Sequence, residues 1–201
     1  MFSLPAGRSR REEILDAAAS VFAERGFSAT TMDAVGAACG VSGPALYHHF
    51  ASKESILGEM LVAISRHLVT QGASIVAEGR DPSSTVAGLV DAHVDFAVTR
   101  AELIAVQFRD LIHADERDQR VVRRLQRQYV ELWVEALVRA APGVDVSQAR
   151  ATVHAMFGLL HSTQHSTALP AAPMRELLRA LAWRLLDPGT LTDALPPASA
   201  T

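Results

Sequence analysis

The sequence is poor in aromatic residues, has a single cysteine and has no long uninterrupted apolar run. Aromatic side chains make up only 5% of the chain while alanine and leucine dominate, a composition that favours helices over sheets. Cys39 has no second cysteine with which to form a disulfide within the chain, which fits a reducing compartment. No stretch approaches the roughly 18 apolar residues that span a bilayer, and Met1 to Gly7 lacks the apolar core of a signal peptide. We therefore expect an all-α protein of the cytoplasm, without a membrane partner.

A basic excess is also absent. The formal net charge is −3, and residues 1–60 carry five Lys or Arg against seven Asp or Glu. Charge alone therefore does not indicate a nucleic-acid partner. If the chain binds DNA, its basic residues must face the phosphates while its acidic residues face away.

The chain does have enough apolar residues for a sizeable core, since 49% of its 201 residues are hydrophobic. They recur at three- and four-residue spacing, with Gly and Pro between the periodic segments. The pattern predicts a three-helix domain over residues 1–52, a larger helical domain over residues 53–189 and a disordered tail over residues 190–201. The expected helices, about nine, span residues 8–25, 31–39, 45–50, 52–71, 83–97, 101–113, 121–140, 147–161 and 174–186.

The segment from Met32 to Phe50 meets the requirements of a helix-turn-helix. Gly36 is small where the second helix of the pair must approach closely, and Gly40 stands at the turn, where a positive φ is wanted. In such a unit the second helix enters the major groove of DNA with its N-terminal end. The apolar positions that join the two helices are Val35, Cys39, Val41 and Leu46.

The candidate DNA contacts are hydroxyls, histidines, backbone amides and an arginine arm. The hydroxyls and Lys53 suit phosphates at helix N-termini, and the arginines suit the backbone or the minor groove. A three-helix unit with a glycine turn also occurs without DNA, in which case Tyr47 covers the core and His48 and His49 are ordinary surface residues. The candidates are Arg8, Arg10, Arg11, Thr30, Thr31, Ser42, Gly43, Pro44, Tyr47, His48, His49 and Lys53.

Over residues 8–56 the sequence resembles the TetR (tetracycline-repressor-like) family. The resemblance implies a homodimer that binds a partly palindromic operator, usually as a repressor, and that a small molecule in the C-terminal domain releases. Gly43-Pro44 departs from the family, because many members carry a basic or polar residue there. The matching residues are Ile14, Ala17-Ala18, Phe22, Gly26-Phe27, Thr30-Thr31, Ala34-Val35, Ala38, Gly40-Val41-Ser42, Leu46-Tyr47, His49-Phe50 and Lys53-Glu54-Ser55.

An effector pocket is expected among the helices that follow, where a few polar groups stand beside apolar faces, as in sites for small ligands. The alternative is that these groups are satisfied core or rim residues. With this aliphatic lining the resemblance favours a small hydrophobic effector such as a fatty acid or an acyl-CoA. An aromatic or drug-like effector that controls an efflux or degradation gene is the alternative. The candidates are His93, Gln107, Arg109, Tyr129, Trp133 and His154.

A dimer interface is expected on the last two helices, where small residues line one helix and leucines line the other. Together they can form the four-helix interface that the family also implies, and packing within one subunit is the alternative. The candidates are Ala151, Ala155, Gly158, Ser162, Leu178, Leu181 and Leu185.

Catalysis finds no support in the sequence, which has no Gly-rich phosphate loop and no nucleophile with a placed base. His154, His161 and His165 share a face if their helix is continuous, but no nearby carboxylate or thiol completes a zinc site. We therefore expect no enzyme, no metal and no cofactor. An enzyme and a helical protein-binding adaptor remain the alternatives, and salt-dependent binding to duplex DNA separates them from a regulator.

Overall fold

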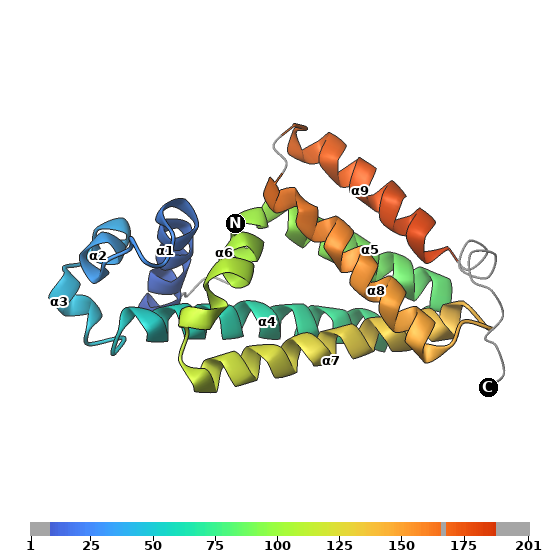
Figure 1. Cartoon of the computed structure of the whole chain (residues 1–201), viewed down its shortest axis with the longest axis horizontal. Coiled ribbons are helices and arrows are strands. Elements are labelled where there is room, and N and C mark those ends of the chain that lie inside the picture. Colours follow the sequence, from blue (N-terminus) through green and yellow to red (C-terminus); the bar gives the residue numbers. More distant parts are fainter. Residues whose placement is uncertain (1–8, 166–167, 188–201) are drawn as a thin grey trace. The chain divides into compact units, whose positions relative to one another are not determined.

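The computed structural model describes residues 9–165 and 168–187, and within them every regular element is helical, which confirms the expected all-α class. Figure 1 shows the order of the helices along the chain. They are α1 (Arg10–Arg25), α2 (Met32–Cys39), α3 (Gly43–Leu46), α4 (Lys53–Ala77), α5 (Pro82–Thr99), α6 (Ala101–Asp110), α7 (Glu116–Ala140), α8 (Val146–His161) and α9 (Ala171–Leu186), with short 3-10 turns at Leu111–His113 and Ser162–His165. The tail expected over residues 190–201 lies outside the described residues.

Most helix starts follow from side-chain caps that can be read in the sequence. Ser9 and Glu12 form a reciprocal capping box at α1, and Thr31 and Ser42 cap α2 and α3. Several boundaries differ from expectation: α4 continues to Ala77 where the expected helix ended at residue 71, α6 ends at Asp110 rather than at residue 113, and α9 begins at Ala171 rather than at residue 174. The helix expected over residues 45–50 is only the single turn Gly43–Leu46, and α7 already begins at Glu116, where a turn was expected. Acidic residues in the first turn of α7 favour that early start, because they face the positive end of the helix dipole.

The described chain divides into two compact units, and the division differs from the expected boundary after residue 52. The first unit contains the residues up to His67 together with Arg100–Leu125, and the second contains Leu68–Thr99 and the residues from Gln126 onward. The first unit keeps α6 because α6 packs against α1. It also keeps the start of α7, since the Asp118 carboxylate lies so close to Gly58 that a Cβ there would come within 2.3 Å of it.

The core of the first unit is built by α1, α2, α3 and the first four turns of α4. Its fully buried side chains include Ile14, Phe22, Val35 and Leu46. By length and composition alone α4 is apolar enough to span a bilayer. This departs from the expectation that no segment would qualify. Its Ile56, Leu57 and Leu61 are nonetheless fully buried, as in a core helix.

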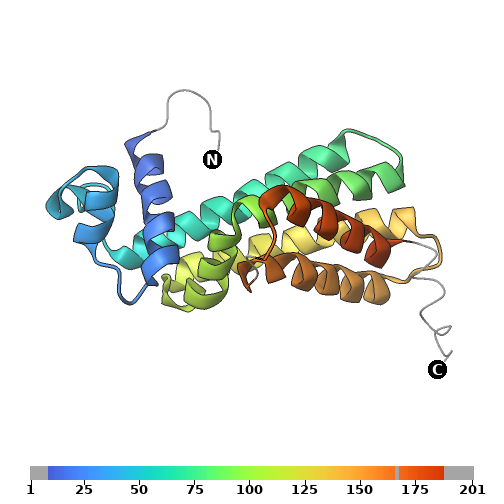
Figure 2. The same cartoon turned by 90° about the horizontal axis from the view of Figure 1, so that it is seen from above.

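In the second unit, α9 lies along α5 and α8, as Figures 1 and 2 both show. Leu178, Ala182 and Leu186 form the buried face of α9. Two ion pairs join the same helix to α5: Arg175 binds Asp95 at 2.8 Å, and Arg179 binds Asp91 at 2.5 Å. The α9 helix is therefore attached to its own subunit by an apolar face with charged pairs beside it.

Candidate nucleic-acid interface and effector site

The helix-turn-helix has the geometry that its glycines predict. Gly40 adopts φ 71° at the end of α2, in the left-handed region, and the Val41 amide donates to the Gly36 carbonyl at 2.9 Å. A Cβ on Gly36 would lie 2.7 Å from the Val41 carbonyl oxygen, so only glycine fits there. Val35 and Leu46 are fully buried where α2 meets α3. The turn and the small residue are thus both required by the close approach of the two helices.

The exposed end of α3 carries polar and aromatic side chains and no cation. Tyr47 is 59% exposed, and Ser42, Pro44 and His48 are exposed beside it. Thr31 is likewise exposed at the start of α2, where its hydroxyl accepts from the Ala34 amide at 3.1 Å. These five residues can reach a DNA partner without leaving their positions in the fold.

Gly43 and His49 are less accessible than expected. A Cβ at Gly43 would fall 1.8 Å from the Asp33 carboxylate, so this buried glycine can offer a partner only its backbone. His49 is half-buried, and its carbonyl accepts from the Arg11 guanidinium. Neither residue presents an exposed side chain comparable with Tyr47.

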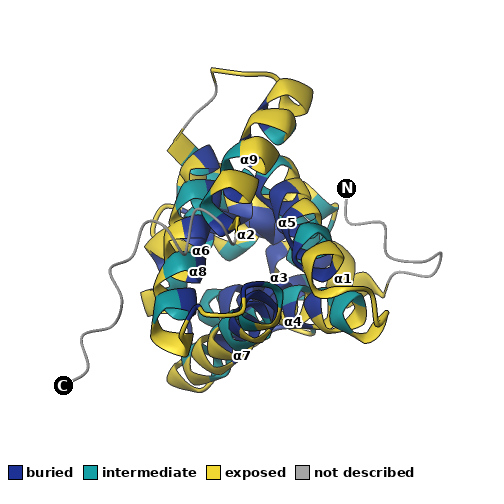
Figure 3. Cartoon of the chain, turned by 90° about the vertical axis from the view of Figure 1, so that its right-hand side faces the viewer, coloured by how far each residue is buried: buried dark blue, intermediate teal, exposed yellow. Residues whose placement is uncertain are grey.

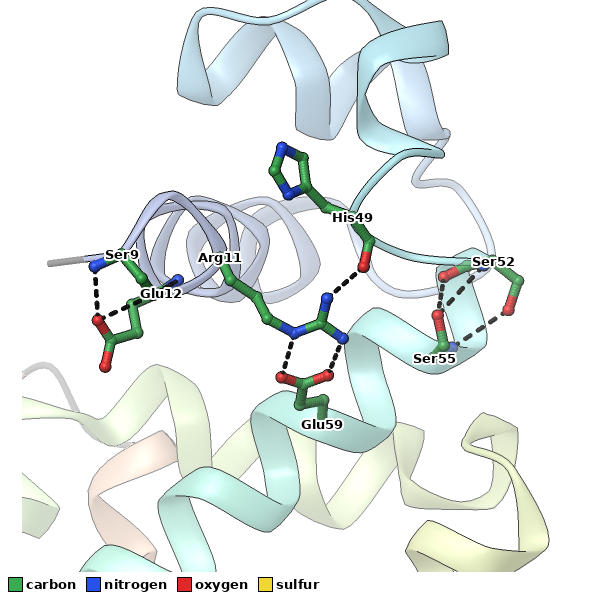
Figure 4. Close-up of polar contacts among 7 residues, drawn as sticks. All are labelled: Ser9, Arg11, Glu12, His49, Ser52, Ser55 and Glu59. Atoms are coloured by element: carbon green, nitrogen blue, oxygen red, sulfur yellow. Dashed lines mark hydrogen bonds and ion pairs between the residues drawn. The ribbon is translucent and has the colours of Figure 1, made fainter.

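Arg11 does not belong to a free N-terminal arm, which corrects the expectation from sequence. It is a residue of α1, and its guanidinium binds both carboxylate oxygens of Glu59 on α4 as well as the His49 carbonyl (Figure 4). The guanidinium also lies 4.1 Å from the centre of the Phe50 ring. Hydrogen bonding to Glu59 raises the pKa of Arg11. Arg11 therefore holds together α1, α4 and the end of residues 42–49, the segment that contains α3 and that we call the recognition turn.

Lys53 and Thr30, which were both expected to bind phosphates, make hydrogen bonds within the fold. The Lys53 ammonium donates to the carbonyls of Phe27 and Thr30, at 2.8 Å each, and lies 4.2 Å from the centre of the Phe27 ring. Thr30 is 1% exposed, and its hydroxyl donates to the Gly26 carbonyl at 2.7 Å. Both side chains thus satisfy carbonyls in the loop between α1 and α2.

Of the other two arginines in the expected arm, Arg8 lies outside the described residues. Arg10 is a helical residue of α1 with an exposed side chain. It binds Glu13 at 2.6 Å and the Cys39 carbonyl at 2.8 Å. Arg10 is therefore attached to the end of α2 and does not extend as an arm.

Three of the expected effector residues come together in the second unit. His93 of α5 is 2% exposed, Tyr129 and Trp133 of α7 are 6% and 1% exposed, and the His93 Nδ1 lies 3.2 Å from the Tyr129 hydroxyl. Phe157 and His161 of α8 complete the cluster. The rings of Phe157 and Tyr129 are stacked with centroids 5.6 Å apart, and the Nε2 atoms of His93 and His161 are 3.0 Å apart. We call these five residues the aromatic cluster.

Burial keeps the polar groups of the aromatic cluster uncharged near neutral pH. Burial lowers the pKa of His93 well below its usual value, and the neighbouring His161 lowers it further. Burial lowers the pKa of His161 to about 4 and raises that of Tyr129. The cluster is thus a buried aromatic environment with a small number of neutral hydrogen-bonding groups.

Phe157 was not among the expected site residues, and His161 was considered only as a metal ligand or as a polar residue near a helix end. Their spacing of four residues places both on one face of α8, a signal that the sequence contains. Within the described residues no group of three or more His, Cys, Asp or Glu is placed to hold a metal ion.

The other three expected effector residues lie elsewhere. Arg109 belongs to the first unit, where it pairs with Asp110 at 2.7 Å and donates to the Phe22 carbonyl of α1 at 2.8 Å. Gln107 is half-buried in the same unit, and His154 is exposed on α8. The structure therefore does not bring these three residues to the aromatic cluster.

The expected dimer residues divide by helix. The small residues expected on α8 are all exposed: Ala151, Ala155 and Gly158 lie on α8, and Ser162 lies directly after its end, in the 3-10 turn Ser162–His165. On α9, Leu178 is buried within the subunit while Leu181 and Leu185 are half-buried. The apolar residues that α9 exposes are instead Leu177 and Trp183, at 43% and 42%. Figure 3 shows exposed residues along α8 and α9.

These features define a class of protein. One unit carries a helix-turn-helix. Its recognition turn is bonded to α1 through Arg11 and exposes Ser42, Tyr47 and His48. The other unit carries the buried aromatic cluster. Helix α4 begins in the first unit and ends in the second. This combination is that of a helix-turn-helix DNA-binding regulator with a separate helical domain.

Comparison with known families is consistent with this class and narrows it. The family of bacterial regulatory proteins called tetR matches residues 14–60, and the tetracyclin repressor-like C-terminal domain matches residues 79–165. The chain therefore belongs to the TetR family. The HTH-type transcriptional repressor KstR2 of Rhodococcus jostii is 36% identical over 130 residues, which cover 64% of this chain and 63% of that protein. The match thus spans less than two thirds of this relative's length.

Solved structures share the fold over most of the chain. A TetR-family regulator from Bordetella parapertussis has a TM-score of 0.77 at 24% identity and covers 88% of this chain and 94% of its own. The ketosteroid regulator KstR2 of Mycobacterium tuberculosis has a TM-score of 0.75 at 23% identity, with coverages of 90% and 95%. AibR, solved with isovaleryl coenzyme A and operator DNA, has a TM-score of 0.69 at 18% identity, with coverages of 86% and 97%. Because these sequence identities are all below 25%, the similarity to these structures shows a shared fold.

Proposed function

We propose that the chain is a cytoplasmic transcriptional repressor that binds a partly palindromic operator as a homodimer and leaves it when a small hydrophobic effector binds. The proposal of DNA binding rests on one observation: one side of the recognition turn is bonded to the rest of the unit and the other side is exposed. Arg11 secures the end of this turn by a hydrogen bond to the His49 carbonyl, and Lys53 secures the loop between α1 and α2, while Tyr47, His48 and Ser42 face outward. A rigid turn with an exposed polar end is what docking into a major groove requires.

The DNA contacts that we assign are Thr31, Ser42, Pro44, Tyr47 and His48, with Arg10 at the edge. The hydroxyls and the phenol suit phosphates, and His48 suits a phosphate or a base edge. Because the recognition helix carries no Lys or Arg, the salt dependence of binding should be shallower than for a strongly basic recognition helix.

The test begins with a duplex selected from a random-sequence library, whose affinity is measured as a function of salt concentration. We expect affinity to fall with rising salt, and Tyr47→Ala combined with His48→Ala to lower it about tenfold or more. Gln128→Ala, an exposed change on α7, is the matched control and should leave affinity unchanged. Salt-independent binding, or equal affinity of the double variant and the control, would contradict the assignment.

The exposed small-residue face of α8 supports the homodimer. A Cβ on Gly158 would meet nothing within 4 Å in its own chain, and Leu177 and Trp183 of α9 are exposed apolar residues in the same unit. Small side chains let the backbones of two helices approach closely, and two copies of α8 and α9 make a four-helix interface.

The aromatic cluster is the site that we assign to the effector. Its rings suit a hydrophobic ligand, and a fatty acid or an acyl-CoA is the preferred class. An aromatic or drug-like ligand is the alternative, and the stacked rings of Tyr129 and Phe157 favour it. The ring of Tyr129 also lies on α4, since a Cβ on Gly72 would come within 3.0 Å of it. A ligand that moves this ring displaces α4, the helix that continues into the DNA-binding unit, and it acts only if it binds the two states unequally.

Thermal shift with a series of acyl-CoAs of increasing chain length tests the preferred class. We expect the melting temperature to rise at one range of lengths, together with release of the selected duplex at the same concentrations. A parallel series of polycyclic aromatic compounds tests the alternative, an aromatic or drug-like effector. Stabilisation by the second series alone would replace the acyl-CoA assignment.

A further inference from the structure

The start of α7 carries an exposed face that consists almost entirely of arginine. Successive residues of an α-helix are about 100° apart, which places four arginines within about 120° of one another around the helix axis. All four are exposed, and all four belong to the first unit, which also carries the helix-turn-helix. We call them the arginine face: Arg117, Arg120, Arg123 and Arg124.

The acidic side chains at the start of α7 leave the arginine face with an excess of positive charge. Asp118 lies on the opposite side of the helix, where its carboxylate is so near to Gly58 of α4 that a Cβ there would come within 2.3 Å of it. Among the described residues, Glu116 is the one carboxylate that pairs with the face, at 3.2 Å from Arg120, and both of these side chains are highly exposed. Four guanidinium groups against one carboxylate give a net charge of +3.

The other three arginines of the face have no carboxylate partner within the described part of the chain. Arg123 donates to the side-chain oxygen of Gln119 at 3.1 Å, which is a neutral acceptor. The side chains of Arg117 and Arg124 form neither an ion pair nor a hydrogen bond with any described residue. Their guanidinium groups are therefore available to a partner, unlike that of Arg11, which the fold already binds.

Helix stability does not explain why arginines gather here. Like charges three or four residues apart on a helix repel each other, and Arg120 stands at one of these spacings from each of the other three. Cations in the first turns of a helix are also unfavourable, because they face the positive end of the helix dipole. The arginine face thus destabilises the start of α7 unless an anion opposes it.

We propose that the arginine face binds the phosphate backbone of duplex DNA, as a second contact surface of the first unit besides the recognition turn. The recognition turn contains no Lys or Arg, and Arg11 and Lys53 are bound by carbonyls. The turn by itself therefore supplies little attraction for phosphates, whereas most of the affinity of proteins for DNA comes from such attraction. This inference rests on the proposed DNA-binding function and locates the cations that it needs.

The arginine face also suits a phosphate backbone in length and in chemistry. Arg117 and Arg124 are seven residues apart, about 10 Å along the axis of α7, which corresponds to about three phosphates of one strand. A guanidinium group binds two oxygens of one phosphate by parallel hydrogen bonds. Phosphate contacts carry no sequence information, so the arginine face adds affinity while the recognition turn selects the sequence.

The test combines Arg117→Gln with Arg124→Gln and measures binding to the selected duplex and to an unrelated duplex of equal length. We expect both affinities to fall about tenfold with their ratio unchanged, because phosphates are the same in every sequence. We expect the slope of log affinity against log salt concentration to become shallower by about 2, since each lost phosphate contact removes about 0.9. An unchanged slope, or a loss confined to the selected duplex, would overturn the inference.

The matched control combines Arg80→Gln with Arg139→Gln, which changes the net charge equally at exposed positions of the second unit. We expect this control to change the slope by less than about 0.5. An equal loss in the control would show that net charge, and not the arginine face, sets the affinity. Urea unfolding of the Arg117 and Arg124 double variant should show unchanged or higher stability, because repulsion is relieved. Lower stability with unchanged duplex affinity would assign these arginines a structural role instead.

An anionic lipid surface is the other partner that attracts a basic helix face. Vesicles of phosphatidylserine and phosphatidylcholine in equal parts are the probe for it. We expect the Arg117 and Arg124 double variant to differ from the unmodified chain in duplex binding and not in vesicle binding. Vesicle binding that is lost in this variant, with duplex affinity unchanged, would replace DNA by a membrane surface.

Failure of this inference is distinguishable from failure of the proposed function. If the unmodified chain binds the selected duplex in a salt-dependent way and the double variant binds it equally well, only the assignment of the arginine face fails. If the unmodified chain shows no salt-dependent duplex binding, the proposed function itself is contradicted.

Discussion

The two units of this protein use their cationic side chains differently. In the first unit, three cations cross between segments and bind backbone carbonyls, in addition to the carboxylate pairs of Arg11 and Arg109: Arg11 on His49, Lys53 on Phe27 and Thr30, and Arg109 on Phe22. In the second unit, Arg150, Arg175 and Arg179 pair with carboxylates on exposed surfaces.

The difference corresponds to two physical requirements. A DNA-reading surface must keep its shape, because a base-edge contact depends on a fixed helix orientation, and charge-assisted bonds to carbonyls hold loops at defined positions. A sensing core must change its free energy when a ligand enters, which requires the ligand to bind the two states of the protein unequally. The following predictions test the contrast, from the largest expected effect to the smallest.

The largest effect is expected on the exposed face of α8. Ala155→Arg combined with Gly158→Arg places two cations where two copies would meet, so we expect the dimer to dissociate and operator affinity to fall by about a hundredfold or more. Sedimentation and duplex binding measure the two effects. Ala73→Arg, an exposed change on α4 in the same unit, is the control. A double variant that remains a dimer would show that this face does not form the interface.

Lys53 tests the structural role of the first unit's cations. Lys53→Met removes both bonds to carbonyls, and we expect the free energy of unfolding to fall by about 2 kcal/mol, measured by urea denaturation. Tyr47→Ala should instead lower operator affinity with little change in stability, because Tyr47 is 59% exposed. If Lys53→Met weakened DNA binding while stability stayed constant, Lys53 would be a phosphate contact after all.

His161 makes the stability of the second unit depend on pH. Its native pKa of about 4 lies below the ordinary value of 6.5, so the unfolded chain binds the proton more readily and stability falls as the pH drops through that interval. Between pH 7 and pH 5 the loss is about 2 kcal/mol for this group. His161→Phe should reduce this dependence and leave the part that comes from His93, whose pKa is lowered as well, whereas His154→Phe, at an exposed position, should not reduce it. An equal slope in all three proteins would show that His161 titrates normally.

The smallest expected effect comes from two arginines that each form an ion pair with a carboxylate on another helix. Arg11→Met removes the donor to the His49 carbonyl as well as the pair with Glu59, and we expect a loss of about 1 kcal/mol. Arg175→Met removes only the pair with Asp95 on the surface, and we expect less than about 0.5 kcal/mol. The midpoint of urea unfolding measures both. A larger loss for Arg175 would reverse the contrast between the units.

Several parts of the fold and of the site were predictable because their causes are local. Caps such as Ser9 with Glu12, the positive φ of Gly40 and the small residue at position 36 depend on neighbours within a few residues. His93, Tyr129 and Trp133 were predictable as a group because helical periodicity places them on apolar faces. Gln107, Arg109 and His154 satisfied the same periodicity, yet the structure places them elsewhere, since periodicity does not say which helix a face meets.

The sequence by itself determined the helical class, the helix-turn-helix and its family, since apolar spacing, caps and turn glycines act over short distances. Only the tertiary structure decided what the cations do. Arg11 and Lys53 look like phosphate contacts in the sequence, but carbonyls from distant loops lie within hydrogen-bond reach and compete for them.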